Sequence, residues 1–390
     1  MEAGVRLDTS ERGESFVLRG RNGTRMRLSA IAYYLLENGR AGHSQEELAA
    51  GLAELTGQPV SIPEVEGAYQ RLEARVRSIE DRPAPAPSGF WLAVPVIPDR
   101  YVMPVARIAA YLFQPAVAGV LITLTAGVVA FAFVGGHMPA LGSEFLAAYG
   151  LFFLSLIAHE FGHAGACSRY GGRPSAIGVG IYLAFPVLFS DVTGAWDLRR
   201  WQRVVVDLGG IYLQGLVGAG YLAAALLTGS RTLVLASALV GFSCLVSLNP
   251  FFKFDGYWAI GDALGVINLG RQRRRLLEYA REKLAGRRPR ALPWPPSVAA
   301  FVVAYLLAAT LVWIAFLVFA LPGLARRAYA YPALLGADLP GLFGPAHSLP
   351  AGAAQSLLVG GLVVIALGTF TVRFCLATAR ALVRLRARFS

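Results

Sequence analysis

The chain has 390 residues, of which 55% are hydrophobic and only 15% are charged, and its formal net charge is +12. Its mean hydropathy of +0.53 excludes an ordinary soluble globular domain, which is less apolar and more highly charged. The composition therefore predicts a polytopic membrane protein.

Residues 1–82 differ from the rest, because they are polar and carry 11 Arg against 13 Asp and Glu. No signal peptide opens the chain, and the segment predicts a separate cytosolic domain. Two strand-like pieces precede three helices that begin at Ser29, Ser44 and Ser61, the second with the capping-box pattern of Ser44 and Glu47. The order predicts a small α+β, winged-helix-like fold. A DNA-binding winged helix is disfavoured, because the domain is not basic.

The stretch MRLSAIAYYLLENG, followed by two more helices, resembles the PqqD-like domains that recognise leader peptides of ribosomally synthesised, modified peptides. The resemblance implies that a leader would add as a strand beside the N-terminal strands. A generic cytosolic cap domain is the alternative interpretation. Residues 83–104 then predict a Pro-rich linker and interfacial segment, with Phe90 and Trp91 suited to the membrane surface.

Residues 105–377 predict a membrane domain, because about 20 apolar residues are needed for each crossing. The expected spans lie near 105–134, 145–168, 205–228, 232–252, 297–320 and 355–377. The fold class is thus mostly α, with about six transmembrane helices.

Basic residues predict the orientation of these spans. Arginines gather at 271–290 and in the tail, residues 378–390, and such a bias marks cytoplasmic flanks. Both termini are therefore expected in the cytoplasm of a bacterial cell with the protein in its inner membrane, and residues 322–354 are expected outside. The arginines predict contacts with lipid headgroups rather than with nucleic acid. The pattern gives no signal for an oligomeric state.

Three cysteines, Cys167, Cys244 and Cys375, lie in or near the expected spans. Their odd number and apolar surroundings predict small apolar residues rather than disulfides.

The motif HEFGH lies inside the second expected span. His159 and His163 are four residues apart, so on a helix they share one face with about 6 Å of rise between them. Glu160 falls about 100° round the helix, beside the position of a metal-activated water. This is the HExxH pattern of zinc hydrolases. Because unpaired ionisable groups are costly in lipid, the cluster predicts zinc ligation.

A catalytic zinc needs a third protein ligand. Cys167 is excluded, because it lies about 12 Å along the helix axis from His159. Asp255 is favoured, since span counting puts it at the same depth as the histidines and Asn249 and Pro250 break the helix before it. Asp207 is the rival, although no such break accompanies it.

HEFGH followed by NPFFKFDGYW resembles the site-2 protease family of intramembrane zinc metallopeptidases, in the branch found beside peptide-maturation genes. The resemblance covers residues 145–262. It implies His159, His163 and Asp255 as zinc ligands and Glu160 as the general base.

Three further residues are candidates for oxyanion or substrate contacts: Gln214, Asn249 and Asp191. In this family a G-x-x-x-N motif is usual, and Gln214 stands where Asn is expected; it either donates to an oxyanion or joins helices. Asp191 either orients the substrate or is a surface loop acid. The segment 175–196 predicts a re-entrant hairpin whose edge strand holds an extended substrate.

Together these features predict an intramembrane zinc endopeptidase that removes a leader from, or matures, a ribosomally made peptide. Two alternatives remain. One is regulated intramembrane proteolysis of a signalling factor, which the lack of a PDZ-like insertion disfavours. The other is a non-catalytic leader-binding or peptide-export component with a structural zinc site. A transporter is disfavoured because no internal repeat is visible.

Overall fold

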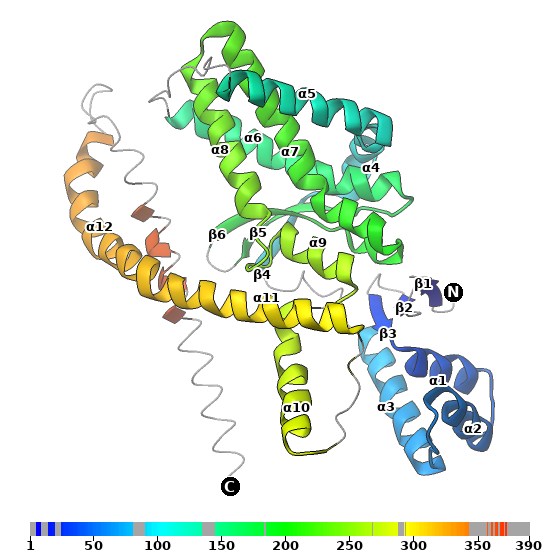
Figure 1. The fold of residues 1–390 in the computed structure, drawn as a ribbon. Helices are drawn as coiled ribbons and strands as arrows, with labels where there is room; N and C mark the ends of the chain where they lie inside the picture. Colours follow the sequence, from blue (N-terminus) through cyan, green and yellow to red (C-terminus); the bar gives the residue numbers. More distant parts are fainter. Residues whose placement is uncertain are drawn as a thin grey trace.

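The computed structural model shows a mostly helical protein, with two three-stranded sheets in the described residues (Figure 1). The structure describes residues 5–8, 15–19, 25–80, 90–134, 145–182, 185–266, 268–287, 292, 294–342 and scattered positions between 357 and 372. The blue strands and helices form one small group in Figure 1, and the green helices gather around the second sheet.

The described elements run in the following order along the chain. The strands are β1 (Val5–Asp8), β2 (Ser15–Arg19), β3 (Arg25–Leu28), β4 (Phe90–Ile97), β5 (Ile177–Tyr182) and β6 (Phe185–Ser190). The α-helices are α1 (Ala30–Arg40), α2 (Gln45–Thr56), α3 (Ile62–Glu80), α4 (Asp99–Ala109), α5 (Pro115–Phe133), α6 (Phe145–Arg169), α7 (Arg200–Thr228), α8 (Arg231–Ser247), α9 (Asp255–Leu264), α10 (Arg273–Leu284), α11 (Pro296–Ala315) and α12 (Leu321–Leu342). Short helical turns, three of 3-10 type and then one of π type, are η1 (Ala110–Phe113), η2 (Thr193–Asp197), η3 (Leu269–Gln272) and η4 (Phe316–Ala320).

The N-terminal domain is an antiparallel sheet, in the order β1-β2-β3, followed by three helices. These elements match the predicted α+β composition, whereas the winged-helix assignment stays a prediction. The helices pack around two apolar clusters, whose fully buried members include Leu36, Leu48, Val65 and Val76. Since burying one such side chain contributes about 1.5–3 kcal/mol, apolar burial is the main stabilising term of this domain.

The predicted helix starts of this domain are confirmed. Ser29 accepts a hydrogen bond from a backbone N–H in the first turn of α1. Ser44 and Glu47 form both bonds of the capping box, at 3.2 Å and 2.8 Å. Before α3, the hydroxyl and the backbone N–H of Ser61 donate to Glu64, and these bonds lower the pKa of the Glu64 carboxyl. Each cap satisfies N–H groups that a helix start leaves unpaired.

The second sheet corrects the linker prediction. Residues 90–97 form β4, which pairs antiparallel with β5, so that this part of the expected linker is a strand. Pro95 favoured a linker in the sequence, but it is tolerated here because β4 is an edge strand in the order β4-β5-β6. Within 175–196 the predicted hairpin forms from β5 and β6, whereas its re-entrance into the membrane stays a prediction. The expected linker's first part, residues 83–89, lies outside the described residues.

Three helical runs in the described part of the chain are long and apolar enough to cross a membrane: Pro115–Phe133, Arg200–Thr228 and Pro296–Gly336. A shorter apolar helix, α8, follows the second of these, and α6 occupies the expected span that contains HEFGH. Most of the expected span near 355–377, together with Cys375 and the tail 378–390, lies outside the described residues. A total of six spans stays a prediction.

Two boundaries differ from the sequence prediction. The expected span at 105–134 is divided, because α4 ends at Ala109 and α5 begins only at Pro115. Proline favours the first position of a helix, and the extended Gln114 before it interrupts the helical path. The segment 322–354, expected as an outer connection, begins as α12, which continues α11 through a π-helical turn.

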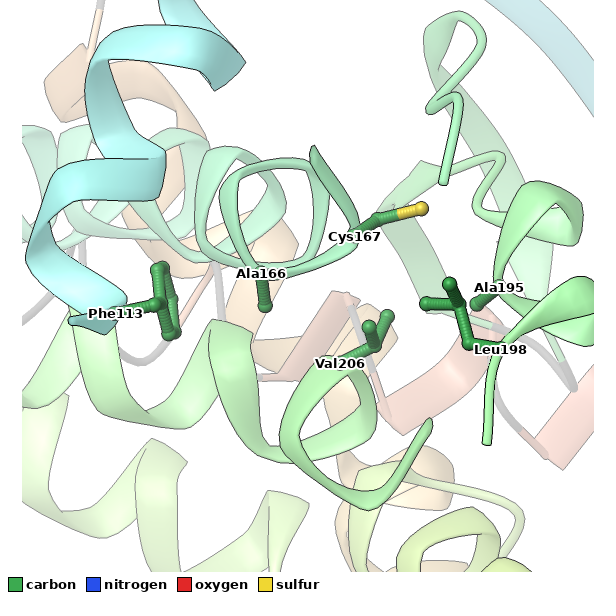
Figure 2. Packing of buried hydrophobic residues seen from close by; sticks show 6 residues of the cluster. All are labelled: Phe113, Ala166, Cys167, Ala195, Leu198 and Val206. Atoms are coloured by element: carbon green, nitrogen blue, oxygen red, sulfur yellow. The ribbon is translucent and has the colours of Figure 1, made fainter. Parts of the chain in front are cut away.

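A buried apolar cluster joins the end of α6 to the start of α7. Figure 2 shows its six members: Phe113, Ala166, Cys167, Ala195, Leu198 and Val206. Cys167 is fully buried among apolar groups, as the sequence predicts for a small apolar residue. No disulfide joins it to Cys244, the other cysteine within the described residues. The cluster holds α6 and α7 together beside the candidate site.

Candidate metal centre

The candidate metal centre lies where α7 contacts both α6 and α9, within the green part of Figure 1. His159 and His163 come from α6, and Asp255 is the first residue of α9. One potential ligand atom from each of the three lies within 4.8 Å of the others. The structure thus brings together the three residues that the sequence singles out as ligands.

The ligand atoms face one another across a small gap. Nε2 of His159 lies 3.1 Å from Nε2 of His163 and 3.1 Å from Oδ2 of Asp255. Nε2 of His163 lies 3.6 Å from Oδ1 of Asp255. Each histidine is only 8% exposed, so water cannot solvate these groups freely. The four-residue spacing on α6 accounts for the close approach of the two imidazoles.

Hydrogen bonds at the outer nitrogens determine which nitrogens face the centre. Nδ1 of His163 lies 2.8 Å from the carbonyl oxygen of Val206. Because a carbonyl can only accept, Nδ1 must carry the proton. Nδ1 of His159 lies 3.0 Å from Oε1 of Gln214. In the neutral imidazoles both protons are then on Nδ1, and both Nε2 lone pairs point into the centre.

The turn between α8 and α9 positions Asp255. Asn249 folds this turn, since its Oδ1 accepts a hydrogen bond from the N–H of Phe251 at 2.8 Å. The hydroxyl of Tyr305 on α11 donates to the carbonyl of Pro250 at 2.8 Å, and the Tyr305 ring stacks on Phe251. The predicted helix break at Asn249 and Pro250 is confirmed, and α11 holds it in place.

Glycines allow the helices to approach closely enough to form the centre. A Cβ added to Gly162 on α6 would collide with the carbonyl of Gly209 on α7. A Cβ added to Gly210 would collide with Nε2 of both His159 and His163. Small residues at helix contacts are the usual means of close packing in membrane proteins. Here the glycine doublet on α7 leaves room for the imidazoles.

The chemistry of this donor set fits a metal cation. Two imidazole lone pairs and a carboxylate converge, and like-charged or electron-rich groups at about 3 Å repel unless a cation lies between them. Oδ2 of Asp255 is buried and makes no hydrogen bond within the described structure, although it is 3.1 Å from a histidine nitrogen. A tetrahedral zinc with bonds of about 2.0–2.1 Å separates its ligand atoms by about 3.3 Å. The observed separations bracket that value.

Glu160 lies beside the centre but is not one of its three potential ligands. It is 7% exposed and directly follows His159 in α6. Its position after His159 turns it about 100° away from the ligand face of α6. A carboxylate that is near the metal position without being a ligand can exchange protons with a reacting water.

The remaining candidates have other contacts. The carboxylate of Asp191 accepts a hydrogen bond from the N–H of Thr193 and so closes the turn after β6. This contact is that of a loop acid. Asn249 organises the turn before α9, and the amide of Gln214 is fully buried against His159. Asp191 is not part of the group of converging ligand atoms, and the described side-chain oxygens of Gln214 and Asn249 contact His159 and the N–H of Phe251 instead.

Asp207, the rival ligand, and Cys167, which the sequence already excludes, both lie outside the group of three residues whose potential ligand atoms converge. The Asp207 carboxyl lies near Asp262 on α9, and Arg203 pairs with this Asp262 at 3.0 Å. Cys167 belongs to the apolar cluster of Figure 2.

Sequence reasoning missed several residues that build the centre. Ser155, one turn before His159, and Ser243 on α8 both contact Gln214. The presence of polar residues within apolar spans could have identified Ser155 and Ser243, and the glycine doublet on α7 could have identified Gly210. The carbonyl of Val206 had no signal, because every residue carries one and only the fold selects which of them meets a histidine.

Comparison with protein-family models, curated proteins and solved structures finds no match for this chain. The functional conclusion therefore depends on the geometry of the centre and on the motifs that form it. A site can support such a conclusion because chemistry is carried by the arrangement of side chains rather than by the fold alone.

Proposed function

We propose that this protein is an intramembrane zinc endopeptidase similar to the site-2 proteases. The observation that carries the proposal is the convergence of His159, His163 and Asp255, with Glu160 beside them. Three protein ligands leave one zinc position for water, as in catalytic sites, whereas structural zinc sites use four protein ligands. This count favours a hydrolase over an export component with a structural metal.

The residues of the centre have different roles in peptide hydrolysis. A zinc ion held by His159, His163 and Asp255 would supply a Lewis acid that acidifies water and polarises the scissile carbonyl. Glu160 accepts the proton of the attacking water and delivers it to the leaving amine. The Nδ1 contacts keep both imidazoles directed at the centre throughout.

The second sheet offers a place for an extended substrate. Peptide bonds inside a helix are poorly accessible, so the substrate must unwind before cleavage. Among the described strands, β6 pairs only with β5, which leaves its other edge for strand addition. Helix α6, which carries the histidines, contacts β6. A peptide added at this edge would therefore run close to the helix that holds the catalytic residues.

Peptide maturation is the reaction that best explains why one chain carries both the N-terminal domain and the metal centre. The N-terminal sheet has two outer strands, β1 and β3, that could pair with an extended leader. A domain that captures a leader beside a peptidase would raise the local concentration of the precursor at the centre. The substrate class is thus a ribosomally made precursor peptide, processed at the inner membrane.

The decisive experiment is mass spectrometry of a co-expressed candidate precursor peptide with wild-type protein or the Glu160→Gln variant. We expect wild type to cleave and Glu160→Gln to lose about 10²- to 10⁴-fold in rate, while both retain one zinc. Glu278→Gln on α10 makes the same chemical change at an exposed position and should cleave normally.

Either of two outcomes would contradict the proposal. Equal cleavage by wild type and Glu160→Gln would show that Glu160 is not the base. Zinc bound at one equivalent without cleavage of precursors or of membrane-bound signalling factors would favour the leader-binding or export role instead. Cleavage of an anti-sigma-type membrane factor, but not of precursors, would move the activity to regulated proteolysis.

A further inference from the structure

Gln214 is a fully buried polar side chain beside the centre. It lies on α7, is 0% exposed and contacts residues from both neighbouring helices, α6 and α8. Its Oε1 lies 3.0 Å from Nδ1 of His159. Its Nε2 lies 3.2 Å from Oγ of Ser155 and 3.5 Å from Oγ of Ser243. All of its described contacts are therefore inside the protein.

The direction of these hydrogen bonds follows from one contact of Ser155. The Ser155 hydroxyl donates to the carbonyl of Phe152 at 2.6 Å. A hydroxyl has a single hydrogen, so towards Gln214 the oxygen of Ser155 can only accept. The amide must then present its NH₂ group to Ser155. Its oxygen is left for His159.

The amide orientation in turn determines the tautomer of His159. An amide oxygen only accepts, so Nδ1 of His159 must donate and the lone pair is on Nε2, which faces Asp255 at 3.1 Å. A reversed amide would present its NH₂ group to Nδ1 and shift the proton to Nε2. A protonated Nε2 cannot bind a metal.

We propose that Gln214 is a positioning residue that holds His159 in its metal-binding tautomer, and that Ser155 sets the orientation of the Gln214 amide. This inference rests on the metal centre of the proposed function and assigns Gln214 a role different from oxyanion stabilisation. An amide engaged by His159, Ser155 and Ser243 has no donor left for a substrate oxygen. The role also differs from joining helices, because it depends on which end of the amide faces the histidine.

The test compares zinc affinity in the full chain, measured by chelator competition in lipid nanodiscs, for wild type, Gln214→Met and Gln214→Glu. We expect Gln214→Met to bind zinc about 10- to 100-fold more weakly. Gln214→Glu keeps an acceptor for Nδ1 and should bind as tightly as wild type or more tightly. A residue that only joined helices would give the opposite order, since a buried unpaired carboxylate disrupts packing more than methionine does.

Ser155→Ala supplies a second, milder test that does not depend on the folding of Gln214→Met. Without Ser155 the amide can reverse, and we expect zinc affinity to fall about 5-fold, within the range of such supporting contacts. Ser237→Ala is the matched control. The Ser237 hydroxyl on α8 donates to the carbonyl of Gly218 on α7, so this substitution also removes a serine contact between α7 and α8 but does not touch Gln214. It should leave the affinity unchanged.

Cobalt substitution adds a spectroscopic readout, because the visible bands of bound Co²⁺ report ligand geometry at His159. We expect the bands to change in Gln214→Met and to return in Gln214→Glu. Wild-type affinity and spectrum in Gln214→Met, or in Ser155→Ala should Gln214→Met not fold, would overturn the inference. Failure of wild type itself to bind zinc would instead remove the metal centre and the proposed function, so the two failures are distinguishable.

Discussion

The N-terminal domain and the metal centre bury polar groups in opposite ways. In the domain the interior is apolar, with Leu36 and Leu48 about 1% exposed, and hydrogen-bonding residues such as Ser44 lie at exposed helix ends. In the centre the polar residues are inside, with Gln214 at 0% and His159 at 8% exposure. The polar groups of the N-terminal domain can form hydrogen bonds with water, whereas those of the metal centre form them with other protein groups.

The difference follows from the surroundings of each region. A helix end that faces water can use water for any N–H that lacks a cap, so each cap contributes only modestly. Within an apolar bundle an unpaired polar group costs several kcal/mol, so every histidine nitrogen needs a defined partner. Glycines then matter more in the centre than in the domain, because the partners must come close enough to bond. Substitutions in the two regions should therefore have separable effects.

The largest expected effect tests the domain interior. Leu36→Ala removes a side chain that is 1% exposed and should lower the free energy of unfolding of the N-terminal domain by about 2–5 kcal/mol. Hydrogen exchange of the α1 amides in the full chain measures this change. Leu55→Ala, at a position 55% exposed on α2, is the matched control and should have little effect. A loss of zinc binding in Leu36→Ala would show that the two regions are not independent.

The second prediction tests close packing at the centre. Gly210→Ala places a methyl group against Nε2 of both histidines, so the imidazoles must move and zinc affinity should fall about 100-fold. Equilibrium binding with a competing chelator measures it. Gly215→Ala on the same helix is the control, because a Cβ there meets nothing within 4 Å. Equal affinity in both variants would contradict the close approach of α7 to the centre.

The smallest expected effect tests a solvated cap. Ser44→Ala removes the acceptor for the N–H of Glu47 and should cost about 1 kcal/mol of N-terminal domain stability. Hydrogen exchange in α2 of the full chain is the measurement. Ser44→Asp keeps an acceptor at the same position and should restore stability. A cost as large as that of Leu36→Ala would mean that caps, rather than apolar burial, hold the domain together.

Local patterns in the sequence predicted local structure well. The caps at Ser29 and Ser44 and the hairpin within 175–196 are confirmed, because each depends on residues close together in the chain. The HEFGH spacing also placed two imidazoles side by side, since four residues make about one helical turn. The helix break before Asp255 belongs to the same class.

Long-range pairing was beyond such patterns. Residues 90–97 looked like part of a linker because of Pro95 and the prolines on either side of the segment, and only their position at a sheet edge makes them β4. The expected span at 105–134 is divided because Pro115 starts a new helix, which the continuous apolar composition conceals. An apolar run is favoured wherever residues are buried, in lipid or in protein. The apolar composition of a segment therefore does not by itself show where a helix begins or ends.

The sequence by itself determined the presence of helices apolar enough to cross a membrane, the helix that carries His159 and His163, and the break that precedes Asp255, because these depend on composition and on spacing within one turn. Only the tertiary structure decided that Gln214 faces His159, that the carbonyl of Val206 faces His163, and that Asp255 rather than Asp207 completes the group. The physical reason is that a hydrogen bond or ligand contact acts over about 3 Å. Residues 43 or 55 positions apart in the chain meet at that distance only after the helices have packed.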